Sequence, residues 1–128
     1  MVVSAVARKT VVVVEDNADN RALVGAILEG RYDVVPYPSG PDALIGCHRS
    51  PPDLILLDIA LPGMDGTQVL GALRADPALA GVPVVALTAD AAAESRETYL
   101  AMGFDDFIAK PILHAQDLRD AVERLIRN

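Results

Sequence analysis

Five polar residues whose side chains suit a metal or phosphoryl site stand where short apolar runs of this sequence end. Each follows a run rich in Val, Ile or Leu. If these runs form neighbouring parallel strands, their carboxyl ends meet at one edge of a sheet. The sequence therefore predicts a site of three carboxylates, one hydroxyl and one ammonium group. The residues are Glu15, Asp16, Asp58, Thr88 and Lys110.

Metal-assisted phosphoryl transfer is the chemistry that these side chains could share. Clustered carboxylates repel one another, which raises their pKa values unless a cation is supplied. Oxygen donors without His or Cys nearby favour a hard ion such as Mg²⁺. The metal, the Lys110 ammonium and the Thr88 hydroxyl could together neutralise a transferring phosphoryl group. Asp58 would then be the nucleophile that accepts this group as an acyl phosphate.

The elements that would position this site are five apolar runs alternating with five stretches of helical periodicity. Such alternation predicts a parallel sheet with helices on both faces, a doubly wound α/β fold. Five units suit the strand order 2-1-3-4-5, in which the first and third strands are neighbours. The predicted strands are Val11–Val14, Val34–Val35, Leu54–Leu57, Val84–Leu87 and Phe107–Ala109, and the predicted helices are Arg21–Leu28, Asp42–Cys47, Thr67–Leu73, Glu94–Met102 and Asp117–Ile126.

Length and composition predict one globular domain. The chain has 128 residues, of which 52% are hydrophobic and 23% charged, enough to bury an aliphatic core. Its net charge of −7 argues against non-specific binding to nucleic acid. The single cysteine, Cys47, excludes an internal disulfide and a multi-cysteine metal site.

Targeting signals are not evident in the sequence. No apolar run approaches the ~18 residues of a membrane-spanning helix, and the start of the chain lacks a basic signal region. We therefore expect a cytoplasmic protein without membrane contact. Residues 1–9 are expected to form a flexible leader, and residues 10–128 a single domain.

Five longer motifs contain the candidate residues in a fixed order: VVVVEDN at 11–17, DLILLD at 53–58, LPGMDG at 61–66, ALTA at 86–89 and GFDDFIAKP at 103–111. This set resembles the receiver domain of bacterial two-component response regulators. It is specific as a set, although each motif alone is weak. The start, with Asn17, Asn20 and Arg21 around the acidic pair, looks most like receivers of hybrid histidine kinases and their single-domain relatives.

This resemblance implies a flavodoxin-like, chemotaxis-receiver-like three-layer sandwich and a role for each residue of the site. The Lys110–Pro111 bond is expected to be cis, because the strand must end by turning Lys110 inward and X-Pro is where the cis isomer costs least. The implied roles are phosphoacceptor for Asp58; Mg²⁺ ligand for Asp16, Asp58, the Ala60 backbone carbonyl and, through water, Glu15; phosphoryl contact for Lys110 and Thr88; and aromatic switch for Phe107.

Three positions depart from what is common in this family. Ala60 and Asp90 lie two residues after Asp58 and Thr88, at sites where side chains tune the lifetime of the phosphoryl group. Leu113 stands where many members place a Ser or Asp cap, so we expect the last helix to begin on backbone hydrogen bonds alone.

Ordinary structural explanations exist for each residue taken singly. Glu15 and Asp16 would favour a helix N-terminus through its dipole, while Asp58 or Thr88 could serve as a turn or capping residue. An aromatic such as Phe107 is more often plain packing. The convergence of the polar residues on one sheet edge favours a site. His48, His114 and Cys47 lie outside that edge, and we assign them no chemistry.

Two enzyme or cofactor classes compete with the receiver interpretation. A flavodoxin-like cofactor protein needs a phosphate-holding loop after the first strand, but here that loop begins with Glu15 and Asp16. A phosphatase of the haloacid dehalogenase type also forms an aspartyl phosphate, but it carries an acid–base Asp where this chain has Ala60. A receiver module belonging to a larger hybrid kinase remains as a third alternative.

The sequence thus predicts a phosphorylation switch and no turnover of external substrates. A histidine kinase or histidine phosphotransfer protein would phosphorylate Asp58 with Mg²⁺. The face formed by the fourth helix, fifth strand and fifth helix would contact a downstream protein or a second copy of the chain. Only two residues follow Ile126, so no output domain is expected on this chain.

Overall fold

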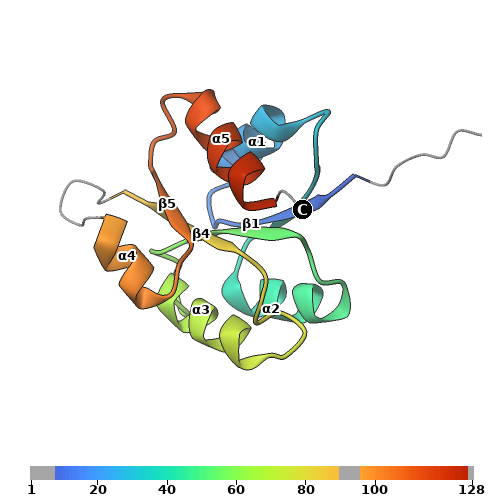
Figure 1. The fold of residues 1–128 in the computed structure, drawn as a ribbon, viewed down its shortest axis with the longest axis vertical. Coiled ribbons are helices and arrows are strands. Elements are labelled where there is room, and N and C mark those ends of the chain that lie inside the picture. The colour runs from blue at the N-terminus through green and yellow to red at the C-terminus, as the bar shows by residue number, and fades with distance from the viewer. Residues whose placement is uncertain (1–7, 90–95, 127–128) are drawn as a thin grey trace, which may run out of the picture.

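A computed structural model describes residues 8–89 and 96–126 and shows one parallel five-stranded sheet between two layers of helices (Figure 1). The strand order is β2-β1-β3-β4-β5, which confirms the predicted fold class. In chain order the elements are β1 (Thr10–Val14), α1 (Ala18–Leu28), β2 (Asp33–Tyr37), α2 (Gly40–Arg49), β3 (Leu54–Asp58), α3 (Gly66–Ala75), β4 (Val84–Thr88), α4 (Arg96–Met102), β5 (Asp106–Ala109) and α5 (Ala115–Ile126).

Each face of the sheet has its own aliphatic core, because successive side chains of a strand point to opposite faces. Val11 and Val13 pack in the cluster beneath α1 and α5, whereas Val12 and Val14 pack in the cluster beneath α2, α3 and α4. Figure 1 shows α1 and α5 together on one side of the sheet and the other three helices on the opposite side. The same alternation, continued past the strand ends, decides the side on which each site residue lies.

Polar N-cap residues mark the beginnings of α1 and α3, which follow the loops at the carboxyl edge of the sheet. Asn17 accepts a hydrogen bond from the Asn20 amide, and Asp65 forms a reciprocal capping box with Gln68. Therefore α1 begins at Ala18, three residues earlier than its apolar periodicity predicts.

The last helix begins without a side-chain cap at the position of Leu113. That side chain is 77% exposed, and the first-turn amide of Asp117 donates to the His114 carbonyl at 3.1 Å. A backbone hydrogen bond thus supports the start of α5, in line with the expectation from the sequence.

The glycines that follow α1 and α4 take up backbone conformations that a side chain would strain. Gly30 and Gly103 have φ angles of 85° and 111°, just after α1 and α4. Gly66 is different, because a Cβ atom there would lie 2.6 Å from the Asp58 carbonyl oxygen. The start of α3 therefore packs against the end of β3, which carries Asp58.

Several sequence expectations fall outside the described residues. They concern most of the leader, Asp90, and the first residues of the helix predicted to begin at Glu94. Within residues 8–89 and 96–126, no helix is long and apolar enough to cross a membrane.

The residues to which we assigned no chemistry lie away from the candidate site. Cys47 is buried in α2, and burial raises the pKa of its thiol to about 11. His48 Nδ1 lies 2.7 Å from Asp76 Oδ2 on the surface, and His114 is exposed.

Candidate functional site

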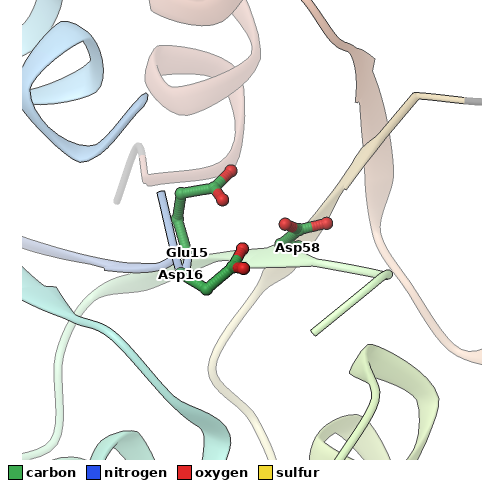
Figure 2. A group of neighbouring side chains, drawn as sticks. All are labelled: Glu15, Asp16 and Asp58. Atoms are coloured by element: carbon green, nitrogen blue, oxygen red, sulfur yellow. The ribbon is translucent and has the colours of Figure 1, made fainter. Parts of the chain in front are cut away.

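Three carboxylates, which we call the acidic cluster, lie at the carboxyl ends of β1 and β3 (Figure 2). They belong to Glu15, Asp16 and Asp58, and a carboxylate oxygen from each lies within 4.8 Å of the others. Glu15 and Asp58 are 1% and 2% exposed, whereas Asp16 is open to solvent. The structure agrees with the sequence prediction that these acids meet, although Asp16 and Asp58 are 42 positions apart in the sequence.

Lys110 is the cation of this site. Its Nζ lies 2.8 Å from Asp58 Oδ2 and 3.1 Å from Glu15 Oε1, and its side chain is 17% exposed. It follows β5 directly and precedes Pro111, and the bond between them is cis, the isomer expected from the sequence. The pleat of the sheet places Lys110 on the same side as Glu15 and Asp58, the side of α1 and α5.

The electrostatics of the acidic cluster are unbalanced. Burial raises the pKa of the Glu15 carboxyl, and the nearby Asp58 charge adds to this effect, although the Asn17 amide and Lys110 oppose it. Burial alone would lower the pKa of Lys110, but its hydrogen bonds to Asp58 and Glu15 outweigh burial and raise it. One ammonium group thus pairs with two buried carboxylates, and the third, exposed carboxylate lies beside those two.

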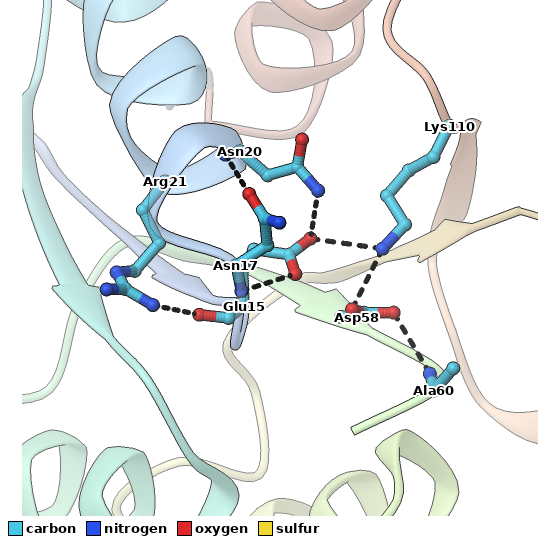
Figure 3. A network of polar contacts seen from close by, with 7 residues as sticks. All are labelled: Glu15, Asn17, Asn20, Arg21, Asp58, Ala60 and Lys110. Carbon is cyan, nitrogen blue, oxygen red and sulfur yellow. Dashed lines mark hydrogen bonds and ion pairs between the residues drawn. The ribbon is translucent and has the colours of Figure 1, made fainter. Parts of the chain in front are cut away.

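The loop after β1 holds Glu15 in place (Figure 3). The Asn17 amide donates to Glu15 Oε2 at 3.1 Å, and the Asn20 side-chain amide donates to Oε1 at 3.4 Å. Arg21 donates to the Glu15 backbone carbonyl at 2.8 Å. The sequence analysis noted Asn17, Asn20 and Arg21 only as family resemblance. They occupy the N-cap and the first turn of α1, two, five and six positions after Glu15, and this spacing is the sequence signal for these contacts.

Asp58 is held on its other side by the backbone of the following loop. The Ala60 amide donates to Asp58 Oδ1 at 2.9 Å (Figure 3), while Lys110 bonds Oδ2. Both carboxylate oxygens are therefore engaged, and the carboxylate is oriented. Ala60 thus reaches the site through its amide, and the ligand role that the sequence analysis gives to its carbonyl stays a prediction.

Thr88 lies on the opposite side of the pleat, facing α4. Its hydroxyl oxygen accepts a hydrogen bond of 3.0 Å from the hydroxyl of Tyr99 in α4. The Tyr99 ring packs on Phe107, with ring centroids 5.2 Å apart and planes tilted by 30°. We call Thr88, Tyr99 and Phe107 the aromatic cluster. Sequence reasoning found Thr88 and Phe107 but missed Tyr99, whose role depends on where α4 docks.

A cavity of about 300 Å³ joins the two groups of residues. Lys110 borders it from the side of the acidic cluster, and Thr88 and Tyr99 border it from the side of α4. The predicted residues therefore form two connected groups rather than one ring of ligands. The remaining lining residues are Ile59, Ala60, Thr67, Ala89 and Met102.

The donor set fits a hard divalent cation. In the part of the chain that the structure describes, the acidic cluster is the one group of His, Cys, Asp or Glu side chains close enough to share a metal ion, and all its donors are carboxylate oxygens. Mg²⁺ prefers such donors and keeps several water ligands. The excess negative charge beside Lys110 supplies a reason for a cation to bind.

Comparisons with known proteins agree with this site. The family model of the response regulator receiver domain matches residues 11–123. The chain is 40% identical over 104 residues to the signal transduction histidine-protein kinase BarA of Escherichia coli (strain K12), covering 80% of this chain and 11% of that protein. It is 37% identical over 122 residues to the DNA-binding response regulator MtrA of Mycolicibacterium paratuberculosis, covering 94% and 53%. The chain thus spans only part of both relatives.

A solved structure extends the likeness to three dimensions. The receiver domain of the sensor histidine kinase PA1611 from Pseudomonas aeruginosa PAO1 superimposes with a TM-score of 0.84 at 34% identity, covering 94% of this chain and 98% of that one. That structure has a magnesium ion coordinated in its active site cleft. The fold, the acidic cluster with Lys110, and these likenesses agree: the chain belongs to the response regulator receiver domain family of two-component systems.

Proposed function

We propose that this chain is a phosphorylation switch in which Asp58 accepts a phosphoryl group from a histidine kinase or a histidine phosphotransfer protein. The observation that carries the proposal is the buried Asp58 carboxylate, oriented by the Ala60 amide and paired with Lys110 beside two further acids. A buried carboxylate with both oxygens directed in this way is suited to act as a nucleophile.

The acidic cluster would hold the Mg²⁺ that such a transfer needs. Asp16 and Asp58 would bind the ion directly and Glu15 through water, with the Ala60 carbonyl as a further ligand. The bound ion would neutralise charge on the oxygens of the transferring phosphoryl group. The exposed Asp16 leaves this side of the cluster open to water and to an ion, while the burial of Glu15 and Asp58 strengthens their attraction for a cation.

The transfer itself exchanges one bond for another. An Asp58 oxygen forms a bond to phosphorus while the bond from phosphorus to the donor histidine breaks, and the electron pair returns to the imidazole nitrogen. The product carries roughly −1.5 to −2 charge at the phosphoryl group. Lys110, now on the carboxylate, would pair with a phosphoryl oxygen, and the Thr88 hydroxyl would donate to another.

The response would reach the molecular surface through Phe107 and the face formed by α4, β5 and α5. Leu100 and Met102 in α4, and Leu113 just before α5, expose 42%, 47% and 77% of their surfaces. A second cavity, of about 480 Å³, lies between β5 and α5 and includes Phe107 in its lining. These features support a downstream protein partner, or a second copy of the chain, as the receiver of the signal.

The proposal treats residues 10–128 as one receiver domain preceded by a leader, in a cytoplasmic setting where a phosphodonor protein meets it. Turnover of external phosphate esters is not part of it. Ala60 stands where a phosphatase would place a general acid, and a methyl group cannot donate a proton. The chain should therefore assist only its own phosphorylation and a slow loss of the phosphoryl group.

Acetyl phosphate provides the direct test of this chemistry. Incubation with Mg²⁺ should add one phosphoryl group, seen by intact-mass spectrometry, that hydroxylamine removes and that chelation of Mg²⁺ prevents. Asp58→Asn should abolish the addition, whereas Asp19→Asn, an exposed acid in the first turn of α1, should leave it unchanged. Phosphate retained by Asp58→Asn would contradict the assignment. Multiple-turnover hydrolysis of phosphate esters that disappears in Asp58→Ala would favour the phosphatase instead.

A further inference from the structure

Tyr99 is the residue that connects the two ends of the aromatic cluster. Its side chain is buried, at 3% exposure, and its hydroxyl donates to Thr88 Oγ1 at 3.0 Å. Its ring lies against Phe107 at 5.2 Å and meets the edge of Phe104 at 6.3 Å. One side chain thus contacts Thr88 through a hydrogen bond and Phe107 through its ring.

The pleat of the sheet places Thr88 and Phe107 on the same side, where both can contact Tyr99. Thr88 and Phe107 both face α4, on neighbouring strands, while Asp58 faces α1 and α5. Phe107 has no hydroxyl, so its ring cannot form a conventional hydrogen bond with Thr88. Tyr99, from the different element α4, contacts both residues, Thr88 through its hydroxyl and Phe107 through its ring.

We propose that Tyr99 is a positioning residue that couples the Thr88 hydroxyl to α4 and to the Phe107 ring. The inference rests on the proposed function, because it concerns how a phosphoryl group on Asp58 is sensed. When Thr88 turns toward a phosphoryl oxygen, the Tyr99 hydroxyl follows it. A buried hydroxyl left without its partner is disfavoured by about tenfold, so following Thr88 is the favourable course.

The shift of Thr88 and Tyr99 would take place beside a cavity and would alter the contacts of Phe107 and α4. The 300 Å³ cavity is bordered by Thr88, Tyr99, Met102 and Lys110, so it offers space beside Thr88 and Tyr99 into which their hydroxyl groups can move. Because the Tyr99 ring lies on Phe107, its shift changes the contact between the two rings. Tyr99 also belongs to α4, so the displacement is passed to the helix that carries the exposed Leu100 and Met102.

The first test observes Tyr99 in the unmodified chain. The probe is beryllofluoride with Mg²⁺, added to protein carrying ¹³C in the tyrosine rings. The Tyr99 ring-carbon resonance next to the hydroxyl should move at saturation, while that of Tyr32, which packs beneath α1 and α5 on the other face of the sheet, should stay in place. A stationary Tyr99 resonance in a sample whose Asp58 amide has moved would overturn the inference.

The second test removes the hydroxyl and keeps the ring. In ¹⁵N-labelled Tyr99→Phe, the affinity for beryllofluoride should stay within about fivefold of the original chain, the effect expected from one neutral hydrogen bond at most. The amide shifts at Phe107 and along Arg96–Met102 should fall to less than half. Tyr37→Phe, which removes a hydroxyl from the distant edge strand β2, is the matched control and should keep the full shifts.

The two possible failures are distinguishable. Unreduced shifts at Phe107 and α4 in Tyr99→Phe would contradict the coupling while leaving the proposed function standing. An original chain in which beryllofluoride moves no amide near Asp58 would contradict the proposed function itself. If Tyr99→Phe does not fold, the ring-carbon measurement on the unmodified chain decides the question.

Discussion

The acidic cluster with Lys110 and the aromatic cluster occupy the same edge of the sheet but are held together by different forces. Glu15 and Asp58 are buried charges, each within 3.1 Å of the Lys110 ammonium. Thr88, Tyr99 and Phe107 are joined by one hydrogen bond between neutral hydroxyls and by ring packing. Removing a partner from a buried ion pair costs about 3–5 kcal/mol, whereas a neutral hydrogen bond contributes about 1 kcal/mol.

This difference in the strength of the contacts suits one edge of the sheet both to hold a reactive group and to change conformation in response to it. The Ala60 amide and the Lys110 ammonium fix the orientation of the Asp58 carboxylate, which in the proposed function is the group that reacts. Weak, neutral contacts beside a cavity can rearrange when a new charge arrives, because little stabilisation is lost in doing so. The pleat of the sheet keeps the acidic cluster and the aromatic cluster apart. Even-numbered residues of β3, such as Asp58, face α1 and α5, whereas even-numbered residues of β4, such as Thr88, face the helices on the other side.

The largest expected effect is on the charged side. Lys110→Met leaves Glu15 and Asp58 buried without their cation, so the free energy of unfolding should fall by about 3 kcal/mol. Urea denaturation in the absence of divalent ions measures this loss, and Mg²⁺ should restore part of it by binding the folded state. An unchanged midpoint would show that Lys110 does not balance these carboxylates.

A steric change at the base of the same region should have the next largest effect. Gly66→Ala places a Cβ atom 2.6 Å from the Asp58 carbonyl oxygen, and such overpacking costs about 1–3 kcal/mol. Gly71→Ala, in the same helix but with nothing within 4 Å of its added Cβ, should instead stabilise the chain by about 0.5–1 kcal/mol. Equal effects of the two variants in thermal melts would argue against the close contact of α3 with β3.

The hydroxyl pair of the aromatic cluster should contribute less. Tyr99→Phe and Thr88→Val should each lower the free energy of unfolding by about 1 kcal/mol. The double variant should lose clearly less than the sum, because both changes remove the same hydrogen bond. Strict additivity in this double-mutant cycle would mean that the two hydroxyls contribute independently.

The smallest expected quantity is the coupling between the two regions in the chain without a phosphoryl mimic. The effects of Lys110→Met and Tyr99→Phe on the free energy of unfolding should add within about 0.5 kcal/mol, since within residues 8–89 and 96–126 Lys110 bonds Glu15 and Asp58 whereas Tyr99 bonds Thr88. When the same cycle of single and double variants is measured with beryllofluoride and Mg²⁺, the effects of Lys110→Met and Tyr99→Phe should no longer be additive. A large coupling already present without the mimic would contradict the division into two regions.

Sequence reasoning predicted the charged side better than the aromatic side, and the reason is physical. Glu15, Asp58 and Lys110 directly follow or end apolar strands, and parallel strand ends must meet, so their convergence follows from the strand pattern. Tyr99 lies within a helix, and the face it presents to Thr88 depends on how α4 docks on the sheet. Nothing in the local periodicity specifies that docking.

Helix starts show the same limit on a smaller scale. The first turn of α1 begins at Ala18 because Asn17 caps it, yet the residues that follow Ala18 in this turn are polar and carry no apolar period. The Ala60 amide contact with Asp58 was also beyond sequence reasoning, because it comes from the backbone path of the loop after β3. The sequence shows which side chains stand at the strand ends. It does not show which backbone amides point into the site or at what angle a helix docks on the sheet.

The most direct test of this division is Thr88→Ala, with phosphorylation and amide shifts measured in one sample. It asks whether the acidic cluster carries the reaction while the aromatic cluster transmits the change to α4. The account predicts that acetyl phosphate with Mg²⁺ still places a hydroxylamine-labile group on Asp58, more slowly than in the original chain, while the shifts at Phe107 and along α4 largely disappear. Full distant shifts in phosphorylated Thr88→Ala would contradict the account, because the signal would then reach α4 without passing through the Thr88 hydroxyl.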